Sequence, residues 1–301
     1  MRNEMRPNDL PPYVLVSPVR NESQFIEQTV RAVLAQSHPP TRWVIVSDGS
    51  TDGTDEIVRS YAKDAPFIEL VRRDPNRPRD FASKAQAVKE GIQRLAGTPY
   101  QFVGNLDGDV SFEADYYKEV LRRFAEEPAL GIAGGLLCDD CGGQWREQIV
   151  SVDFSVAGPI QMFRRECYEA IGGYLPLPFG GIDGVAEGMA RMRSWKVRTF
   201  SELVVRHHRR VGTAGRSVIR ACFDLGRREG VIGYHPVFEL LRSGNRLRTS
   251  PLVVGGLLHY IGYLFGRLSD RPAGIPDEYI RFLRREQWDR VRHTLGGAAF
   301  D

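Results

Sequence analysis

The chain has 301 residues, of which 42% are hydrophobic and 26% charged, and this fits one large globular domain with an extension, or two domains. Four cysteines exclude a disulfide-stapled scaffold at this length. The net charge of +3 is the sum of −5 over residues 1–205 and +8 over residues 206–301. The second segment contains 17 Arg, no Lys and 9 acidic residues.

The N-terminal segment MRNEMRPNDLPP is charged and Pro-rich, and it contains no apolar stretch. We expect a disordered arm over residues 1–12. No secretory signal is predicted, so the expected location is the cytoplasm.

The next hundred residues alternate between short apolar runs and segments with helical periodicity. This alternation predicts an α/β fold with a mostly parallel, Rossmann-like sheet and helices on both of its faces. The sequence contains neither GxGxxG nor GxxxxGK[ST], which counts against a dinucleotide-binding domain and a P-loop NTPase. The predicted strands are 13–17, 43–47, 67–71 and 101–106, and the predicted helices are 26–34, one beginning near residue 54, and 82–95.

Two of these strands end in carboxylates. Asp107-Gly108-Asp109 follows the apolar run 100–106, and Asp48 follows the run 44–47. Two carboxylates one residue apart can share Mg²⁺ or Mn²⁺, which keep open positions for phosphates. Ligands of parallel sheets bind beyond the carboxyl ends of the strands. These positions predict a nucleotide–metal site, with a solvated turn as the alternative for an isolated Asp-x-Asp.

Four motifs occur in the order and spacing of glycosyltransferase family 2, which the chain therefore resembles over about residues 13–211. They are PVRNE (18–22), SDGSTDGT (47–54), SKAQAVKEGI (83–92) and NLDGD (105–109). The resemblance implies an inverting, nucleotide-sugar-dependent transferase with the GT-A fold. It also implies a nucleotide-sugar donor, most simply a UDP-sugar, and an acceptor hydroxyl on a saccharide or lipid-linked saccharide. No nucleic-acid partner is expected.

The resemblance also implies roles for single residues. The loop that contains Pro18, Arg20 and Glu22 would hold the nucleotide together with Asp48, which would accept a hydrogen bond from the uracil imide. The alternative for Asp48 is a turn former or helix cap. Lys84 would lie near the base or the phosphates, or else be a solvated helix lysine.

For the metal, the resemblance implies Asp109 as a direct ligand. Asp107 would contact the ribose or reach the ion through water. His207 or His208, which follow a strand-like segment in the run HHRRVG, would lie near the metal or diphosphate. The alternative for the two histidines is a basic loop at the domain edge. Mn²⁺ or Mg²⁺ is the expected cofactor, and it would offset the charge that develops on the departing diphosphate.

Inversion needs a general base that removes the proton of the acceptor hydroxyl. In the family this base is the Asp of a Glu-Asp pair ahead of a helix, and Asp183 aligns with it. Here Ile182 replaces the Glu, so Glu187 is a second candidate for the base. Asp183 could instead be only a helix N-cap. The missing Glu also favours, as an alternative function, a non-catalytic module that binds sugar nucleotides.

A nucleotidyltransferase is a further alternative, because such enzymes combine a similar sheet with metal-binding carboxylates. It would need a Gly-rich phosphate loop soon after the first strand. Residues 14–22 contain no glycine and one basic residue, Arg20, which counts against this function.

Residues 13–211 are expected to form the catalytic domain, and residues 212–301 an Arg-rich helical extension. Within the extension, residues 251–266 contain no charge and include Gly262-x-x-x-Gly266, which would allow close helix contact. This stretch is shorter than the roughly 20 residues that span a bilayer. A buried hairpin helix and an interfacial helix both fit the pattern. In the second case an anionic membrane surface would be a partner, and the protein would lie peripherally on the inner face of the cell membrane.

Overall fold

The computed structural model describes residues 10–74, 81–148, 154–209, 218–247, 251–269 and 274–295. The chain divides into two compact units. The first consists of residues 1–176 and 182–211, and the second of residues 177–181 and 212–301. Residues 177–181 were expected in the catalytic domain, but they belong with the C-terminal unit.

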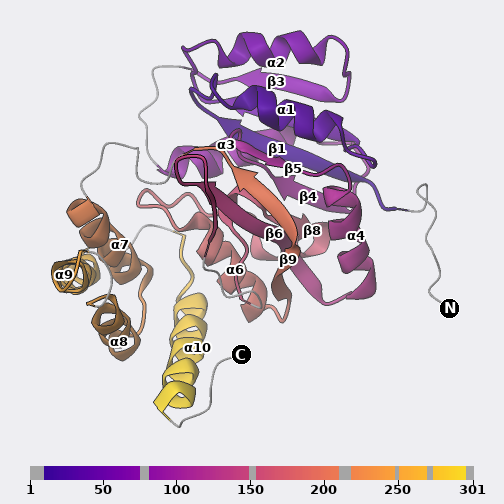
Figure 1. The fold of residues 1–301 in the computed structure, drawn as a ribbon. Coiled ribbons are helices and arrows are strands. Elements are labelled where there is room, and N and C mark those ends of the chain that lie inside the picture. The colour runs from indigo at the N-terminus through magenta and orange to yellow at the C-terminus, as the bar shows by residue number, and fades with distance from the viewer. Residues whose placement is uncertain are drawn as a thin grey trace. The chain divides into compact units, whose positions relative to one another are not determined.

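The first half of the sheet is parallel, as predicted. Strands lie side by side in the order β3-β2-β1-β4, and the pairs β3–β2, β2–β1 and β1–β4 are all parallel (Figure 1). These strands read as continuous apolar runs because helices cover both faces of a parallel sheet. Their bounds are β1 (Tyr13–Val19), β2 (Arg42–Ser47), β3 (Ile68–Arg72) and β4 (Phe102–Asn105).

The second half of the sheet mixes both strand directions. β8 (Met162–Arg164) runs antiparallel to β4 and to β6 (Leu130–Asp140). β9 (Lys196–His207) pairs in parallel with β6 and antiparallel with β5 (Val110–Phe112). The short β7 (Trp145–Glu147) pairs with the far end of β6. The start of β5 therefore lies beside the C-terminal end of β9, which in turn lies beside the C-terminal end of β6.

Alternate residues of β1 face two different helical layers, as the pleat of a strand requires. Leu15 belongs to a core cluster that includes Ile26 and Val30 of α1. Val16 lies beneath Gly91 of α3, where a Cβ atom would come within 2.4 Å of its side chain. The helices of this unit are α1 (Ile26–Leu34), α2 (Thr54–Ala62), α3 (Phe81–Arg94), α4 (Tyr116–Glu126), α5 (Arg165–Ile171) and α6 (Ile182–Met192), with a 3-10 turn η2 (Gly158–Ile160).

Residues 10–12 differ from the expected disordered arm. Leu10 is buried in the core cluster, and the Gln101 amide donates a hydrogen bond of 2.9 Å to the Pro12 carbonyl. The rest of the predicted arm, residues 1–9, lies outside the described residues.

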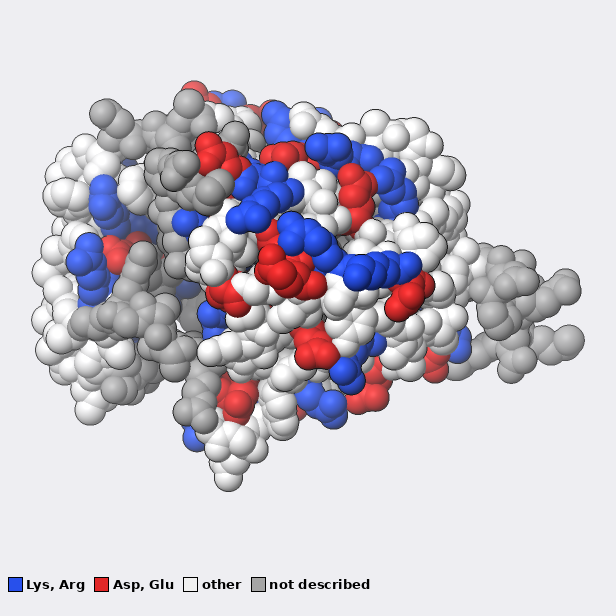
Figure 2. Space-filling view, turned by 90° about the horizontal axis from the view of Figure 1, so that it is seen from above, with Lys and Arg blue, Asp and Glu red and all other residues white. Residues whose placement is uncertain are grey.

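Surface charges of the first unit are largely paired on its helices. Glu27 contacts Arg31 in α1, and Glu56 contacts Arg59 in α2. Figure 2 shows basic and acidic side chains interleaved on the face that it views. Exposed pairs of this kind add at most about 1 kcal/mol each to stability.

The second unit consists of helices, as predicted. They are α7 (Val218–Ile232), α8 (Pro236–Arg246), α9 (Val254–Leu268) and α10 (Asp277–Leu295) (Figure 1). The α10 helix is tied to the turn between α7 and α8, because Arg284 Nε donates to the Gly233 carbonyl and Gln287 accepts from the His235 amide.

Helices α7 and α9 pack backbone to backbone through four glycines. A Cβ atom at Gly226 or Gly230 of α7 would lie 1.8 or 2.2 Å from a carbonyl oxygen of α9. At Gly262 or Gly266 of α9 it would lie 2.2 or 2.0 Å from a carbonyl oxygen of α7. The close helix contact predicted for Gly262-x-x-x-Gly266 is confirmed.

The α9 helix is buried along its glycine stripe and exposed on its other side. Most large apolar side chains that are exposed among the described residues belong to the second unit. Within the described residues, no helix combines the length and the apolar character needed to cross a bilayer. The exposed apolar residues of the unit are Val218, Ile219, Val237, Leu240, Leu241, Leu247, Leu252, Val253, Val254, Leu257, Ile261, Leu264, Phe265 and Leu268.

Candidate active site

Asp107 and Asp109 lie in the tight connection between β4 and β5, as their sequence position predicts. The Asp107 amide donates to the Pro159 carbonyl over 2.9 Å. Both carboxylate oxygens of Asp107 accept from Nζ of Lys84 in α3, at 2.7 and 2.8 Å. Asp107 thus has a cationic partner within the protein.

Asp109 faces His207 across paired strands. Its neighbour Val110 pairs with His207 in the β5–β9 ladder, and His207 pairs with Asp139 in the β6–β9 ladder. His207 Nε2 lies 3.4 Å from Asp109 Oδ2, and His207 Nδ1 lies 2.7 Å from Asp139 Oδ1. Gln148 donates to both oxygens of Asp139 and fixes that carboxylate. Sequence reasoning missed Asp139, because only the strand register brings it to this row.

The charges of Asp109 and His207 stabilise each other. Burial opposes the charge of Asp109, but His207 and Arg209 outweigh it and lower the pKa of the carboxyl group. Burial also opposes the charge of His207, yet Asp109 and Asp139 raise the pKa of the imidazole to about 9. Without another cation, the imidazolium therefore neutralises part of the carboxylate charge.

The same residues fit a divalent cation. Asp109 Oδ1 is buried and has no hydrogen-bond partner among the described residues. Asp109 offers oxygen and His207 offers nitrogen, a donor set that suits Mn²⁺. Asp139 contacts the second ring nitrogen of His207, the position at which an outer carboxylate orients a metal-binding histidine.

Arg209 occupies part of this acidic environment. Its Nε donates to Asp109 Oδ2 over 2.9 Å, and a terminal nitrogen of its guanidinium group pairs with Glu22. Burial and the charge of Asp109 raise the pKa of Glu22 to about 7. Arg209 thereby links the loop after β1 to the end of β9.

Asp48 lies directly after β2 and is buried against a second arginine that sequence reasoning missed. Arg73 Nη1 donates to Asp48 Oδ1 over 2.7 Å, and its Nε lies 3.2 Å from Glu90. Arg20 approaches the other oxygen of Asp48 at 3.7 Å. The pair Arg72-Arg73 directly after the predicted strand 67–71 was the available signal for Arg73.

The loops after β1 and β2 hold each other. Pro18 lies in β1 opposite Val46 of β2. The amide of Glu22 donates to Thr54 Oγ1 over 2.8 Å, and the amide of Thr51 donates to the Asn21 side chain over 2.9 Å. These contacts place the predicted nucleotide loop beside the end of β2.

Asp183 lies in the first turn of α6, against Gly158 of the 3-10 turn. A Cβ atom at Gly158 would come within 2.8 Å of Asp183 Oδ2, so glycine leaves room for this carboxylate. Burial lowers the pKa of Lys84, but the charges of Asp107, Asp183 and Asp109 outweigh it and raise the pKa. Three of the predicted carboxylates thus stabilise the positive charge of Lys84.

Glu187, one turn further along α6, is buried within the protein. It accepts hydrogen bonds from the Val156 amide at 2.7 Å and from Gln161 Nε2 at 2.8 Å. Burial raises its pKa to about 8. These contacts connect Glu187 to the segment that precedes β8.

His208 differs from its neighbour His207. Its Nε2 lies 2.8 Å from Ser111 Oγ, and its ring meets Trp145 edge-on at 5.5 Å. Burial lowers the pKa of His208. Of the two histidines considered from the sequence, His207 is the one whose imidazole lies against the Asp109 carboxylate, whereas His208 donates only its backbone amide to the Asp109 carbonyl.

The family model described as "Glycosyl transferase family 2" matches residues 14–172. The chain belongs to glycosyl transferase family 2. One relative of this transferase is the poly-beta-1,6-N-acetyl-D-glucosamine synthase of Staphylococcus epidermidis, 32% identical over 115 residues. That match covers 38% of the chain but about a quarter (26%) of the relative.

Solved structures show that this family 2 transferase has the GT-A fold, as predicted. It is similar to the mannosyltransferase PcManGT from Pyrobaculum calidifontis in complex with GDP-Man and Mn²⁺, with a TM-score of 0.57 and 15% identity over 96% of this chain and 88% of that one. It is also similar to Staphylococcus aureus TarS 1–349 in complex with UDP-GlcNAc, with a TM-score of 0.55 and 14% identity over 93% and 81% of the two chains.

Proposed function

We propose that the chain is an inverting glycosyltransferase that moves a sugar from a UDP-linked donor to a hydroxyl group of a saccharide acceptor. The row Asp139–His207–Asp109, with its unpartnered Asp109 oxygen, is the observation that supports this function most. Lys84 connects that row electrostatically to Asp107 and Asp183. The family membership adds the reaction class.

In this proposal the nucleotide lies across the loops after β1 and β2. The uracil imide donates to Asp48, which Arg73 orients. The loop that holds Pro18, Arg20 and Glu22 flanks the base and ribose. Lys84 and Asp107 lie closer to the ribose and phosphates. Because Asp48 is buried at a strand end, its hydrogen bond to the base would be directional and therefore selective.

The reaction is a single displacement at the anomeric carbon. Asp183 takes the proton of the acceptor hydroxyl while its oxygen forms the new bond to that carbon. The bond from the anomeric carbon to the phosphate oxygen breaks, and its electron pair leaves with the nucleoside diphosphate. A Mn²⁺ or Mg²⁺ ion held by Asp109 and His207 would act as a Lewis acid toward this diphosphate. Glu187 supports the segment before β8 rather than acting as the base.

The decisive experiment measures Mn²⁺-dependent release of nucleoside diphosphate, with and without acceptor saccharides. A thermal-shift screen of UDP-, GDP- and dTDP-sugars identifies the donor first, because a ligand of the native state raises the Tm. We expect a UDP-sugar to give the largest rise, and Asp109→Ala and Asp183→Asn to lower turnover at least about a hundredfold. Donor binding without turnover in the parent chain would instead identify a sugar-nucleotide binding module.

We further propose that the second unit docks on an anionic membrane surface and thereby meets a lipid-linked acceptor. Its helices expose large apolar side chains, including Leu257, Ile261 and Phe265 at 55%, 53% and 54%. The sequence of this unit contains 14 Arg, no Lys and 9 acidic residues, which gives a net charge of +5. Exposed apolar groups combined with arginines suit the headgroup layer of anionic lipids. The protein would then lie peripherally on the inner face of the cell membrane.

Vesicle flotation tests this docking. The chain should float with vesicles that contain anionic lipid and remain in solution with zwitterionic vesicles or at high salt. Leu257→Ser with Phe265→Ser should abolish flotation. Trp145→Ser, which removes a comparably exposed side chain of the first unit (45%), should not. A parent chain that stays in solution with anionic vesicles would refute the docking.

A further inference from the structure

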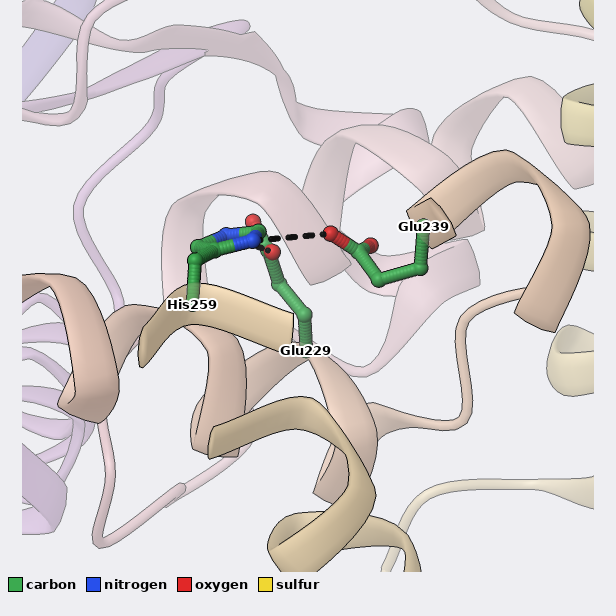
Figure 3. Close-up of side chains that lie close together, drawn as sticks. All are labelled: Glu229, Glu239 and His259. Atoms are coloured by element: carbon green, nitrogen blue, oxygen red, sulfur yellow. Dashed lines mark ion pairs between the residues drawn. The ribbon is translucent and has the colours of Figure 1, made fainter. Parts of the chain in front are cut away.

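The second unit brings three buried ionisable side chains to one point. Glu229 of α7, Glu239 of α8 and His259 of α9 are 2%, 0% and 0% exposed. Figure 3 shows the two carboxyl groups and the imidazole directed toward one another. One ligand atom from each residue lies within 4.8 Å of the other two. Three separate helices thus converge on one small polar centre.

Direct contacts leave this centre unsatisfied. His259 Nε2 is 2.9 Å from Glu229 Oε2, and His259 Nδ1 is 3.5 Å from Glu239 Oε1. Nevertheless, Glu229 Oε2, both oxygens of Glu239 and His259 Nε2 have no hydrogen-bond partner among the described residues. Buried polar atoms without a partner are strongly unfavourable, so a further group is needed there.

The outer contacts point the same way. His259 Nδ1 lies 2.8 Å from Ser243 Oγ, and Arg242 Nη2 lies 3.1 Å from Glu229 Oε1. These partners engage one atom each of His259 and Glu229, and they leave His259 Nε2 and Glu229 Oε2 with no partner besides each other. Hydrogen-bonded outer partners of this kind orient metal ligands in proteins.

A proton satisfies the centre only in part. Burial and the charge of Glu229 raise the pKa of Glu239 to about 9, so this carboxyl group holds a proton in the absence of a cation. That single proton can serve two carboxyl oxygens at most. It leaves the second Glu239 oxygen without a partner, whereas one cation can bind an atom of each of the three residues.

We propose that Glu229, Glu239 and His259 bind one divalent transition-metal ion that fastens α7, α8 and α9 together. Two carboxylates with one imidazole suit Zn²⁺ or Mn²⁺ better than Mg²⁺ or Ca²⁺, which prefer oxygen alone. Ligand distances of about 2.0–2.2 Å require only small side-chain rotations from the present arrangement. This centre shares no residue with the site around Asp109 and does not depend on the proposed catalytic function.

The test uses the full chain with Asp109→Asn, which removes the proposed catalytic ligand. After treatment with a chelator and addition of Zn²⁺ or Mn²⁺, we expect one ion per chain after gel filtration. We expect the Tm to rise by about 5–10 °C when the free ion is at a hundredfold excess over its Kd, and Mg²⁺ to have no such effect. No retained ion together with no rise in Tm would overturn the proposal.

Glu239→Gln in the same background separates a metal site from a shared proton, because Gln resembles the protonated carboxyl group. We expect it to lower the metal affinity at least about a hundredfold. Glu278→Gln, an exposed change on α10, should leave the affinity unaltered. An unchanged metal-dependent Tm in Glu239→Gln would place the ion elsewhere and refute the assignment.

A spectroscopic measurement avoids the risk that a variant does not fold. Co²⁺ added to the stripped Asp109→Asn chain should give visible absorption of a four- or five-coordinate ion with nitrogen and oxygen ligands. The spectrum of free, hydrated Co²⁺ at equimolar protein would refute the site.

Discussion

The two units differ in how fully their buried ionisable side chains are paired. In the first unit, Asp109, His207 and Asp139 form a row of alternating charge in which one atom, Asp109 Oδ1, has no hydrogen-bond partner among the described residues. In the second, Glu229, Glu239 and His259 converge with atoms that meet no hydrogen-bond partner in the described chain. Paired groups at a sheet edge can exchange a protein partner for a ligand. The more numerous unpartnered atoms of the helical core fit the proposed structural ion, whereas the largely paired row fits the proposed turnover.

The largest expected effect is on the rate of the reaction that we propose for the first unit. Asp183→Asn keeps the shape of the side chain but removes the proton acceptor, so the transfer rate should fall about 10²–10⁴-fold. Initial rates of nucleoside diphosphate release at saturating donor measure this. The donor-dependent rise in Tm should be retained, and Asp115→Asn at the exposed start of α4 serves as the control. Full activity in Asp183→Asn would exclude Asp183 as the base.

A pH effect on stability should be the next largest. The pKa of Glu187 is about 8 in the folded protein, against about 4.5 when exposed. Because the protonated form is favoured on folding, its stabilisation is complete below pH 4.5 and is lost as the pH rises to 8. The slope is about 1.4 kcal/mol per pH unit. Glu187→Gln should remove this part of the slope in denaturant unfolding between pH 5 and 8.

The control for this pH effect is Glu56→Gln, which changes an exposed glutamate of α2 and should keep the slope of the parent chain. Identical slopes for Glu187→Gln and the parent would mean that Glu187 is ionised throughout this range.

Two glycine substitutions test how closely the helices of the second unit pack. Gly262→Ala puts a Cβ atom 2.2 Å from the Phe223 carbonyl, so it should destabilise the unit by about 1–3 kcal/mol. Gly244→Ala in α8 meets no atom within 4 Å and should stabilise by about 0.5–1 kcal/mol. Chemical denaturation of both variants measures the difference. Equal effects would show that α7 and α9 do not pack as closely as described.

The smallest expected effect is on metal affinity and concerns Asp139, which contacts the second ring nitrogen of His207. Asp139→Asn keeps the contact with His207 but removes the charge, so Mn²⁺ affinity should fall about 10–100-fold. Calorimetric titration measures the affinity, with Asp140→Asn as the neighbouring control. An unchanged affinity would separate Asp139 from the proposed metal site.

Sequence patterns predicted the first unit well because its signals are local. Apolar runs marked the strands, and a parallel sheet brings the residues after them to one edge. Asp48, Asp107 and Asp109 were therefore predictable as neighbours of that edge. Arg73 and Asp139 were missed, since their contacts with Asp48 and His207 depend on which residues of neighbouring strands lie side by side.

The second unit was predicted as helices but not in its interior. The spacing of Gly262 and Gly266 indicated close contact, and the structure has it. Glu229, Glu239 and His259 are far apart in sequence and belong to three helices, so only the packing of those helices reveals their convergence. The spacing of residues within one helix does not predict which residues of another helix they will contact.

The four glycines through which α7 and α9 pack limit the substitutions that this unit can accept. At Gly226, Gly230, Gly262 and Gly266 every other amino acid would force two backbones apart. Random mutagenesis should therefore recover almost no replacements at these codons. The outward-facing positions of the same helices remain free to vary, so new surface affinities can arise there while the helix pair keeps its geometry.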